Sequence, residues 1–348
     1  MSQSRVKTRH DGFLGRITLD RPQALNALSM DMIEAIDAAL IAWRDDPAIR
    51  CVLIEGAGPR GLCAGGDVRA MRQNVLDGAA DRADAYLAAE YRMNARIRSF
   101  PKPYVAFMDG ITMGGGVGVS AHGAHRIVTE RTRLAMPEVL IGFLPDVGGT
   151  WLLSRAPNEF GTHAGLTGGS LTAHDAINCG LADLHVASER LPALAQALER
   201  APDAEAIRRL IADHASPAEP SGFTVDGGWI ARCYAGDDPQ TILNRLRAAP
   251  EPAAQAAATA IEAACPMSVA ASLRALRLAA VLDQFSACQE LEARIGAKLL
   301  RRADFAEGVR AVVVDKDRSP RWSPSTLAAI DPEELDAVFA PAPASSRS

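Results

Sequence analysis

The chain has 348 residues, which is long enough for two domains and a sizeable core. Apolar residues make up 48% of it and charged residues 23%, an ordinary globular composition that excludes a disordered or fibrous protein. The formal net charge of -5 is spread without long runs of one sign, so the chain offers no basic face for a nucleic acid backbone.

The six cysteines are scattered and form no CxxC pair, which argues against a zinc cage or a disulfide framework. We therefore expect reduced, buried thiols. No stretch approaches the length of a membrane helix, and the first twelve residues contain no apolar core of the kind found in secretory signals. These features predict a cytoplasmic protein without a membrane partner.

The first part of the chain alternates short apolar strands with helices. Residues 12–20 alternate apolar and polar side chains, which predicts a half-buried strand. From Ser29 to Trp43 the apolar residues recur at helical spacing, so a helix is expected to pack on a sheet. Residues 49–56 and 103–110 are typical of buried strands, and a helix is expected to begin at residue 68.

The same cycle continues toward residue 190. Residues 125–130 are expected as a strand and residues 150–156 as a helix, and a further helix ends at Gly180 before another strand. This alternation predicts an α/β core over residues 1–190. Residues 191–340 are expected to form a mainly helical domain, followed by a loose tail over residues 341–348.

Two glycine-rich segments, CAGGD (residues 63–67) and MGGGVG (residues 113–118), each follow a predicted strand. Glycine allows close approach of a ligand to backbone N–H groups, as an oxyanion hole requires. The alternative is that these glycines only make turns. Asp67 and Asp146 have a similar structural alternative, as N-caps of the helices that follow them.

Glu138 and Asp146 lie in MPEVLIGFLPDVGG, an otherwise apolar segment. An apolar setting raises a carboxyl pKa and suits the group to act as a base or a nucleophile, and a second carboxylate can bind a substrate hydroxyl. Pro137 and Pro145 argue against one continuous helix, so sequence spacing alone does not predict that the two carboxylates converge.

Three competing motifs are weaker. His122 and His125 form an HxxH pair, but no third ligand follows at a diagnostic spacing, so we expect no metal. GVSAH resembles the GxSxG nucleophile motif of hydrolases but has His122 in place of its last glycine, so Ser120 is expected to be a core or helix-start serine. Residues 116–121 match GxGxxA of NAD-dependent dehydrogenases, but the segment after it is short for a crossover helix.

Four segments together resemble the crotonase superfamily of enoyl-CoA hydratases and isomerases, in the order expected for that family. They are LDRPQALNAL, CAGGDVRAM, GITMGGGVGVS and MPEVLIGFLPDVGGT. Residues 304–322, DFAEGVRAVVVDKDRSPRW, look like the branch of this superfamily that hydrolyses 3-hydroxyisobutyryl-CoA in valine breakdown. The resemblance implies a crotonase (ClpP-like) fold of repeated ββα units with a C-terminal helical region.

The resemblance also implies roles for individual residues. Gly66 and Gly115 match the backbone N–H donors that bind the thioester carbonyl. Glu138 matches the glutamate that activates water or attacks the carbonyl, and Asp146 matches the aspartate that orients the 3-hydroxyl group. Glu90 matches a further carboxylate on the substrate side.

The coenzyme A portion is expected to contact the backbone of Leu25, Ala64 and Gly65. Coenzyme A enters as part of the substrate, so no separate cofactor is expected. Related enzymes often form trimers, but the extra helical region could cover that interface or create another, so the sequence leaves open whether the chain forms a homo-oligomer. Hydratases of this family carry a first catalytic glutamate where this chain has Gly118. Without it, hydration of a double bond loses a proton-handling group, whereas hydrolysis needs one activated water and a stabilised oxyanion.

The sequence therefore predicts hydrolysis of a short 3-hydroxyacyl-CoA thioester. The alternatives are a hydratase or isomerase on the same scaffold, an acyl-CoA binder without catalysis, and, more remotely, an NAD-dependent dehydrogenase.

Overall fold

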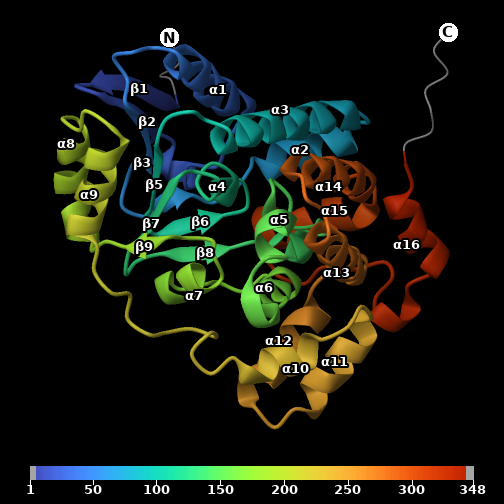
Figure 1. The fold of residues 1–348 in the computed structure, drawn as a ribbon. Coiled ribbons are helices and arrows are strands. Elements are labelled where there is room, and N and C mark those ends of the chain that lie inside the picture. Colours follow the sequence, from blue (N-terminus) through green and yellow to red (C-terminus); the bar gives the residue numbers. More distant parts are fainter. Residues whose placement is uncertain (1–4, 342–348) are drawn as a thin grey trace.

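The structure is a computed structural model that describes residues 5–341. A six-stranded sheet has the order β1-β2-β3-β5-β7-β9 and is parallel except for the antiparallel pair β1 and β2 (Figure 1). Its strands are β1 Val6–Asp11, β2 Leu14–Leu19, β3 Cys51–Gly56, β5 Tyr104–Met108, β7 His125–Val128 and β9 Leu184–His185. A smaller parallel sheet has the order β4-β6-β8, with strands β4 Gly61–Cys63, β6 Ile111–Met113 and β8 Arg133–Ala135.

Helices connect and cover these strands, as parallel neighbours require. In the first part of the chain they are α1 Met30–Arg44, α2 Val68–Leu76, α3 Ala80–Arg98, α4 Gly115–Gly118, α5 Gly149–Leu153, α6 Phe160–Thr167 and α7 Ala173–Asn178. Short 3₁₀ turns lie at Pro22–Ala24, Glu138–Ile141, Pro157–Glu159 and Ser188–Arg190. The expected α/β class is confirmed.

Helices predominate after Leu191, as predicted. They are α8 Leu191–Leu198, α9 Ala204–His214, α10 Gly228–Tyr234, α11 Pro239–Ala248, α12 Pro252–Ala263, α13 Pro266–Ala280, α14 Phe285–Leu299, α15 Ala303–Val309 and α16 Pro332–Phe339. A π-helix spans Arg310–Val314, and a 3₁₀ turn spans Leu327–Ala329. Among residues 5–341, no single helix is long and apolar enough to cross a membrane; α12 and α13 meet that test only as a pair bent by 114°.

These helices do not all lie on one side of the core. Apolar residues of α8 and α9 pack with Leu14, Leu53 and Phe107 of the larger sheet. Residues of α13, α14 and α15 belong instead to the main hydrophobic cluster, and Figure 1 shows α14 close to α3 and α5. The boundary predicted near residue 190 stays a prediction, and residues 342–348 of the predicted tail lie outside the described part.

Most predicted elements are present with shifted ends. The strand expected over residues 12–20 is β2, those over 49–56 and 103–110 are β3 and β5, and the helix after Ser29 is α1. The glycine-rich segment CAGGD begins at Cys63, which is the last residue of strand β4. Strand β1 was not predicted because its side chains are mostly polar and exposed, as an edge strand allows. All six cysteines are buried and unpaired, as expected.

Candidate active site

The two glycine loops lie side by side because β4 and β6 are adjacent parallel strands. Parallel strands end at the same edge of their sheet, so the loops that follow Cys63 and Met113 meet there. A Cβ atom added to Gly115 would lie 3.2 Å from the backbone nitrogen of Gly66. Within residues 5–341, neither the Gly66 nor the Gly115 N–H donates a hydrogen bond to the protein. The site thus offers two free donors at one place.

The backbone of these loops needs glycine. Gly65 has a φ of +114° and Gly114 a φ of +50°, in the region that side chains disfavour. A Cβ on Gly66 would lie 2.7 Å from the hydroxyl oxygen of Tyr86, so position 66 has no room for a side chain. The glycines therefore do more than form turns: they bring bare backbone to the edge of the sheet.

Glu138 follows the third strand of the small sheet, β8, and begins a 3₁₀ turn. Its side chain is buried, and its Oε1 atom would lie 2.8 Å from a Cβ added to Gly114. No described group forms a hydrogen bond with its Oε2 atom. Burial raises the pKa of Glu138 well above its usual range, and the charge of Asp146 raises it further. Glu138 is therefore a buried carboxyl group beside the two donors.

Asp146 lies in the turn that leads into α5, and its side chain is also buried. The Tyr91 hydroxyl donates a 2.8 Å hydrogen bond to its Oδ2 atom. Burial raises the pKa of Asp146 to about 7, and the bond from Tyr91 opposes that rise. The Asp146 side chain accepts no capping hydrogen bond from α5, whose N-cap residue is Gly148, so the capping alternative is wrong for this residue. For Asp67 it is right, because Asp67 accepts the Ala70 N–H at the start of α2.

Glu90 enters the same space from helix α3. Its side chain is 2% exposed, and its Oε1 atom has no hydrogen-bond partner among the described residues. A Cβ on Gly115 would collide with that oxygen. Burial, followed by the charge of Asp146, raises the pKa of Glu90 well above its usual range. Glu90, Glu138 and Asp146 therefore disfavour one another's ionisation.

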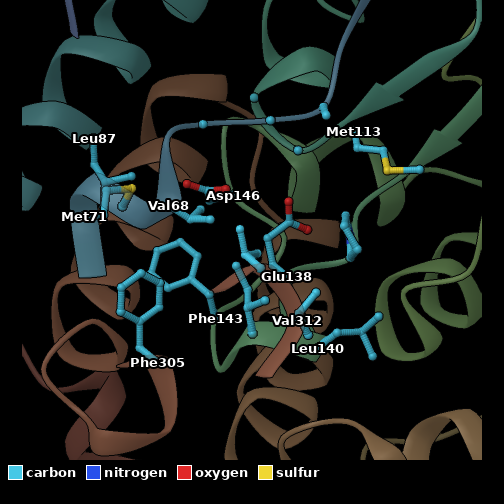
Figure 2. Close-up of a pocket in the computed structure, with 18 of the residues that line it drawn as sticks. Val68, Met71, Leu87, Met113, Glu138, Leu140, Phe143, Asp146, Phe305 and Val312 are labelled. Atoms are coloured by element: carbon cyan, nitrogen blue, oxygen red, sulfur yellow. The ribbon is translucent and has the colours of Figure 1, made fainter. Parts of the chain in front are cut away.

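These groups line one cavity of about 300 Å³ whose walls are otherwise apolar. Figure 2 shows the Glu138 and Asp146 carboxyl groups near its middle, with Phe143 and Phe305 on one side. The predicted site residues that line it are Ala64, Gly65, Gly66, Glu90, Gly115, Glu138 and Asp146. Leu25 does not line it but accepts a 2.9 Å hydrogen bond from the Ala64 N–H. The fold therefore brings together residues from four separate segments.

Several residues of the site were not predicted. Tyr91 binds Asp146, and Phe305, Val312 and Val313 from the C-terminal region close the cavity. Glu292 of α14 is completely buried behind the Asp146 turn, and burial raises its pKa to about 8. A signal for Glu292 exists in the sequence: it occupies an apolar-face position of α14, in register with the buried side chains at 288, 295 and 299.

The position of Gly118 is sterically closed. A Cβ atom there would lie 2.9 Å from Asn94 Nδ2 and 2.9 Å from Val147 Cβ. A longer side chain at residue 118 would have to displace the turn that carries Asp146. The chain thus lacks both the carboxylate that the resemblance places there in hydratases and the space for it.

The competing motifs serve structural roles. The Ser120 hydroxyl donates a 2.6 Å hydrogen bond to the Gly116 carbonyl and is fully buried, which confirms a core serine. His122 Nε2 lies 2.7 Å from the Val147 carbonyl oxygen. Residues 115–118 form one helical turn instead of the crossover helix of a dinucleotide fold. Within residues 5–341, no three His, Cys, Asp or Glu side chains are placed to hold a metal ion.

Comparison with known proteins identifies relatives that match almost the whole of this chain. A family model described as enoyl-CoA hydratase/isomerase matches residues 14–339. A Gallus gallus protein named "3-hydroxyisobutyryl-CoA hydrolase, mitochondrial" is 38% identical over 98% of this chain and 90% of its own length.

Two crystal structures share the fold. One, described as a carnitinyl-CoA dehydratase from Mycobacterium thermoresistibile, is 42% identical with a TM-score of 0.92, over 97% of each chain. The other, described as an enoyl-CoA hydratase from Rhodobacter sphaeroides, is 42% identical with a TM-score of 0.88, over 97% of this chain and 98% of its own.

Proposed function

Because this chain belongs to the enoyl-CoA hydratase/isomerase family, we propose that its pocket hydrolyses a short 3-hydroxyacyl-CoA thioester. The preferred substrate in this proposal is 3-hydroxyisobutyryl-CoA, which yields 3-hydroxyisobutyrate and coenzyme A. The name of the Gallus gallus relative supports this reaction, and so does the similarity over almost the whole chain. The observation that carries it is the meeting of one buried glutamate with two free backbone N–H groups.

The two N–H groups of Gly66 and Gly115 polarise the thioester carbonyl. As a nucleophile adds, negative charge develops on the carbonyl oxygen, and both N–H groups stabilise it. Donors of this kind are effective because they are oriented before the reaction and lie in a site that excludes water. The loop backbone fixes their orientation, since Gly65 and Gly114 hold conformations that glycine alone adopts easily.

Glu138 delivers the nucleophile by one of two routes. As a base it takes a proton from water, whose oxygen bonds to the carbonyl carbon; as a nucleophile its own carboxylate forms that bond, and water then hydrolyses the anhydride. In the base route the carbon–sulfur bond then breaks, and Glu138 returns its proton to the departing thiolate of coenzyme A. In the nucleophile route the thiolate leaves as the anhydride forms, and the water that hydrolyses the anhydride supplies the proton that the thiolate takes up. Glu138 suits both routes because its Oε2 atom forms no hydrogen bond with any described group and is therefore available to water or substrate.

Asp146 binds the 3-hydroxyl group of the acyl chain. Tyr91 occupies one of its oxygens, which leaves the other for the substrate. Glu90 lies on the same side and limits the space available for the acyl chain. The apolar walls formed by Met71, Phe143 and Phe305 favour a short aliphatic chain.

The coenzyme A portion follows the backbone near Leu25, Ala64 and Gly65. The Leu25 carbonyl accepts the Ala64 N–H, so these segments run side by side as one backbone surface at the edge of the cavity. Coenzyme A is part of the substrate, and no separate cofactor is proposed. A cytoplasmic location remains a prediction, whether the chain forms a homo-oligomer remains open, and the Gallus gallus relative is named mitochondrial.

Hydration or dehydration on the same scaffold is the second candidate. It is favoured by the descriptions of the two crystal structures with 42% identity. The closed position of Gly118 argues against it, because no second carboxylate can stand there without moving Val147.

Product analysis separates the two candidates. We would incubate the protein with 3-hydroxyisobutyryl-CoA, 3-hydroxypropionyl-CoA and crotonyl-CoA, and follow free thiol and enoyl absorbance together. The proposal expects thiol release from the 3-hydroxy esters. Loss of enoyl absorbance from crotonyl-CoA without thiol release would favour the second candidate.

A further inference from the structure

Glu292 is a fully buried carboxylate that does not line the cavity. It accepts hydrogen bonds from the Gly148 N–H at 2.7 Å and the Thr150 N–H at 3.0 Å. A third bond comes from the Thr150 hydroxyl at 2.5 Å. Because a buried carboxylate without partners is strongly unfavourable, these three donors account for its presence in the core. All three belong to the segment directly after Asp146.

That segment has an unusual backbone. Val147 has a φ of +52° and Gly148 a φ of +78°. A β-branched residue such as valine disfavours the left-handed region, so the turn persists only where surrounding contacts hold it. Glu292 accepts hydrogen bonds from Gly148 and Thr150, which follow Val147 in the chain. Glu292 is therefore a contact that holds the backbone directly after Asp146.

A second residue of α14, Gln289, contacts Tyr91, the residue that binds Asp146. Gln289 Nε2 donates a 3.0 Å hydrogen bond to the backbone carbonyl of Tyr91. The hydroxyl of Tyr91 is the group that donates to Asp146. Gln289 and Glu292 are three residues apart and so lie on one face of α14. One helix face thus contacts both the turn that carries Asp146 and the tyrosine that binds it.

We propose that Glu292 is a positioning residue that sets the selectivity of the pocket for 3-hydroxyacyl groups by fixing the turn that presents Asp146. This inference rests on the proposed function. Gly66, Gly115 and Glu138 act on the thioester itself, and Glu292 forms no hydrogen bond with any of the three. Loss of Glu292 should therefore weaken recognition of the hydroxyl group more than thioester cleavage.

The test compares two substrates. We would measure kcat/KM for 3-hydroxyisobutyryl-CoA and for isobutyryl-CoA, which lacks the hydroxyl, in the wild type and in Glu292→Gln. A glutamine has one acceptor oxygen and cannot accept all three bonds. We expect the ratio of kcat/KM for 3-hydroxyisobutyryl-CoA to kcat/KM for isobutyryl-CoA to fall about tenfold or more, because small displacements of a positioned group have effects of this size. The matched control is Glu290→Gln, an exposed residue of the same helix, which should leave the ratio unchanged.

The ratio is insensitive to loss of folded protein, because both substrates report on the same active molecules. If Glu292→Gln yields no folded protein, Thr150→Val carries the test, since it removes one donor and keeps the carboxylate. An unchanged ratio, or an equal fall with both substrates, would overturn the inference. A wild-type protein that releases no thiol from either ester would instead contradict the proposed function on which it rests.

Discussion

The hydroxyl of Tyr91 donates a 2.8 Å hydrogen bond to Asp146 Oδ2, whereas the nearby Glu138 Oε2 has no partner among the described residues. This difference divides two buried carboxyl groups into distinct roles. The bond from Tyr91 favours the ionised form of Asp146 and opposes the effect of burial on its pKa. Glu138 has no such side-chain donor and keeps the more basic character that a general base needs.

The pH dependence of the reaction should depend on the interaction between Glu138 and Asp146. Burial and the charge of Asp146 raise the pKa of Glu138, so its protonated form, which cannot accept a proton from water, persists to higher pH than for an exposed glutamate. The rate should therefore fall as pH decreases through a value well above 4.5. Asp146→Asn removes the neighbouring charge and should move this acidic limb to lower pH.

The measurement is kcat/KM against pH with isobutyryl-CoA, so that recognition of the hydroxyl group does not enter. Glu290→Gln serves as a carboxylate control outside the pocket. An acidic limb that stays in place in Asp146→Asn would show that Asp146 does not act on the titrating group.

Gly115→Ala should disable the oxyanion site. A Cβ there collides with Glu90 Oε1 and lies 3.2 Å from the Gly66 nitrogen, so both the donor and the space for the carbonyl are disturbed. We expect kcat to fall by about a hundred- to a thousandfold, the effect of losing one oxyanion donor. Gly228→Ala is the matched control because nothing lies within 4 Å of a Cβ at that position. A Gly115→Ala enzyme with wild-type kcat would contradict this assignment.

Gly118→Glu tests whether the missing hydratase carboxylate can be restored. Because Val147 Cβ lies 2.9 Å from a Cβ at residue 118, the new side chain must displace the Asp146 turn. Overpacking of this kind lowers the free energy of unfolding by about 1 to 3 kcal/mol. We expect a lower melting temperature, slower thiol release and no hydration of crotonyl-CoA. A stable variant that hydrates crotonyl-CoA would show that lack of space at residue 118 is not the reason why the chain lacks a carboxylate there.

Local patterns predicted much of the fold. Periodicity located α1 and the buried strands β2, β3 and β5, because each buries one clear apolar face or run. It missed β1, whose polar side chains carry no such pattern and whose pairing with β2 is a tertiary effect. The small sheet was missed in part because β4, β6 and β8 are only three residues long.

The candidate site was predictable only where residues carry a local signature. The glycines and the carboxylates at 138 and 146 stand out in their segments, and the family resemblance added Glu90. Tyr91, Glu292 and Phe305 reach the site through helix packing between distant segments. Sequence spacing does not encode such contacts, so the contribution of the C-terminal helices to the pocket emerged only from the structure.

The most direct test of the central claim is thiol release from 3-hydroxyisobutyryl-CoA by the wild type and by Glu138→Gln. Glutamine retains the size of the side chain but cannot accept a proton from water or attack the carbonyl. We expect rapid thiol release by the wild type and a fall of about a hundred- to ten-thousandfold in the variant, at unchanged melting temperature. Thiol release by Glu138→Gln at the wild-type rate would contradict it.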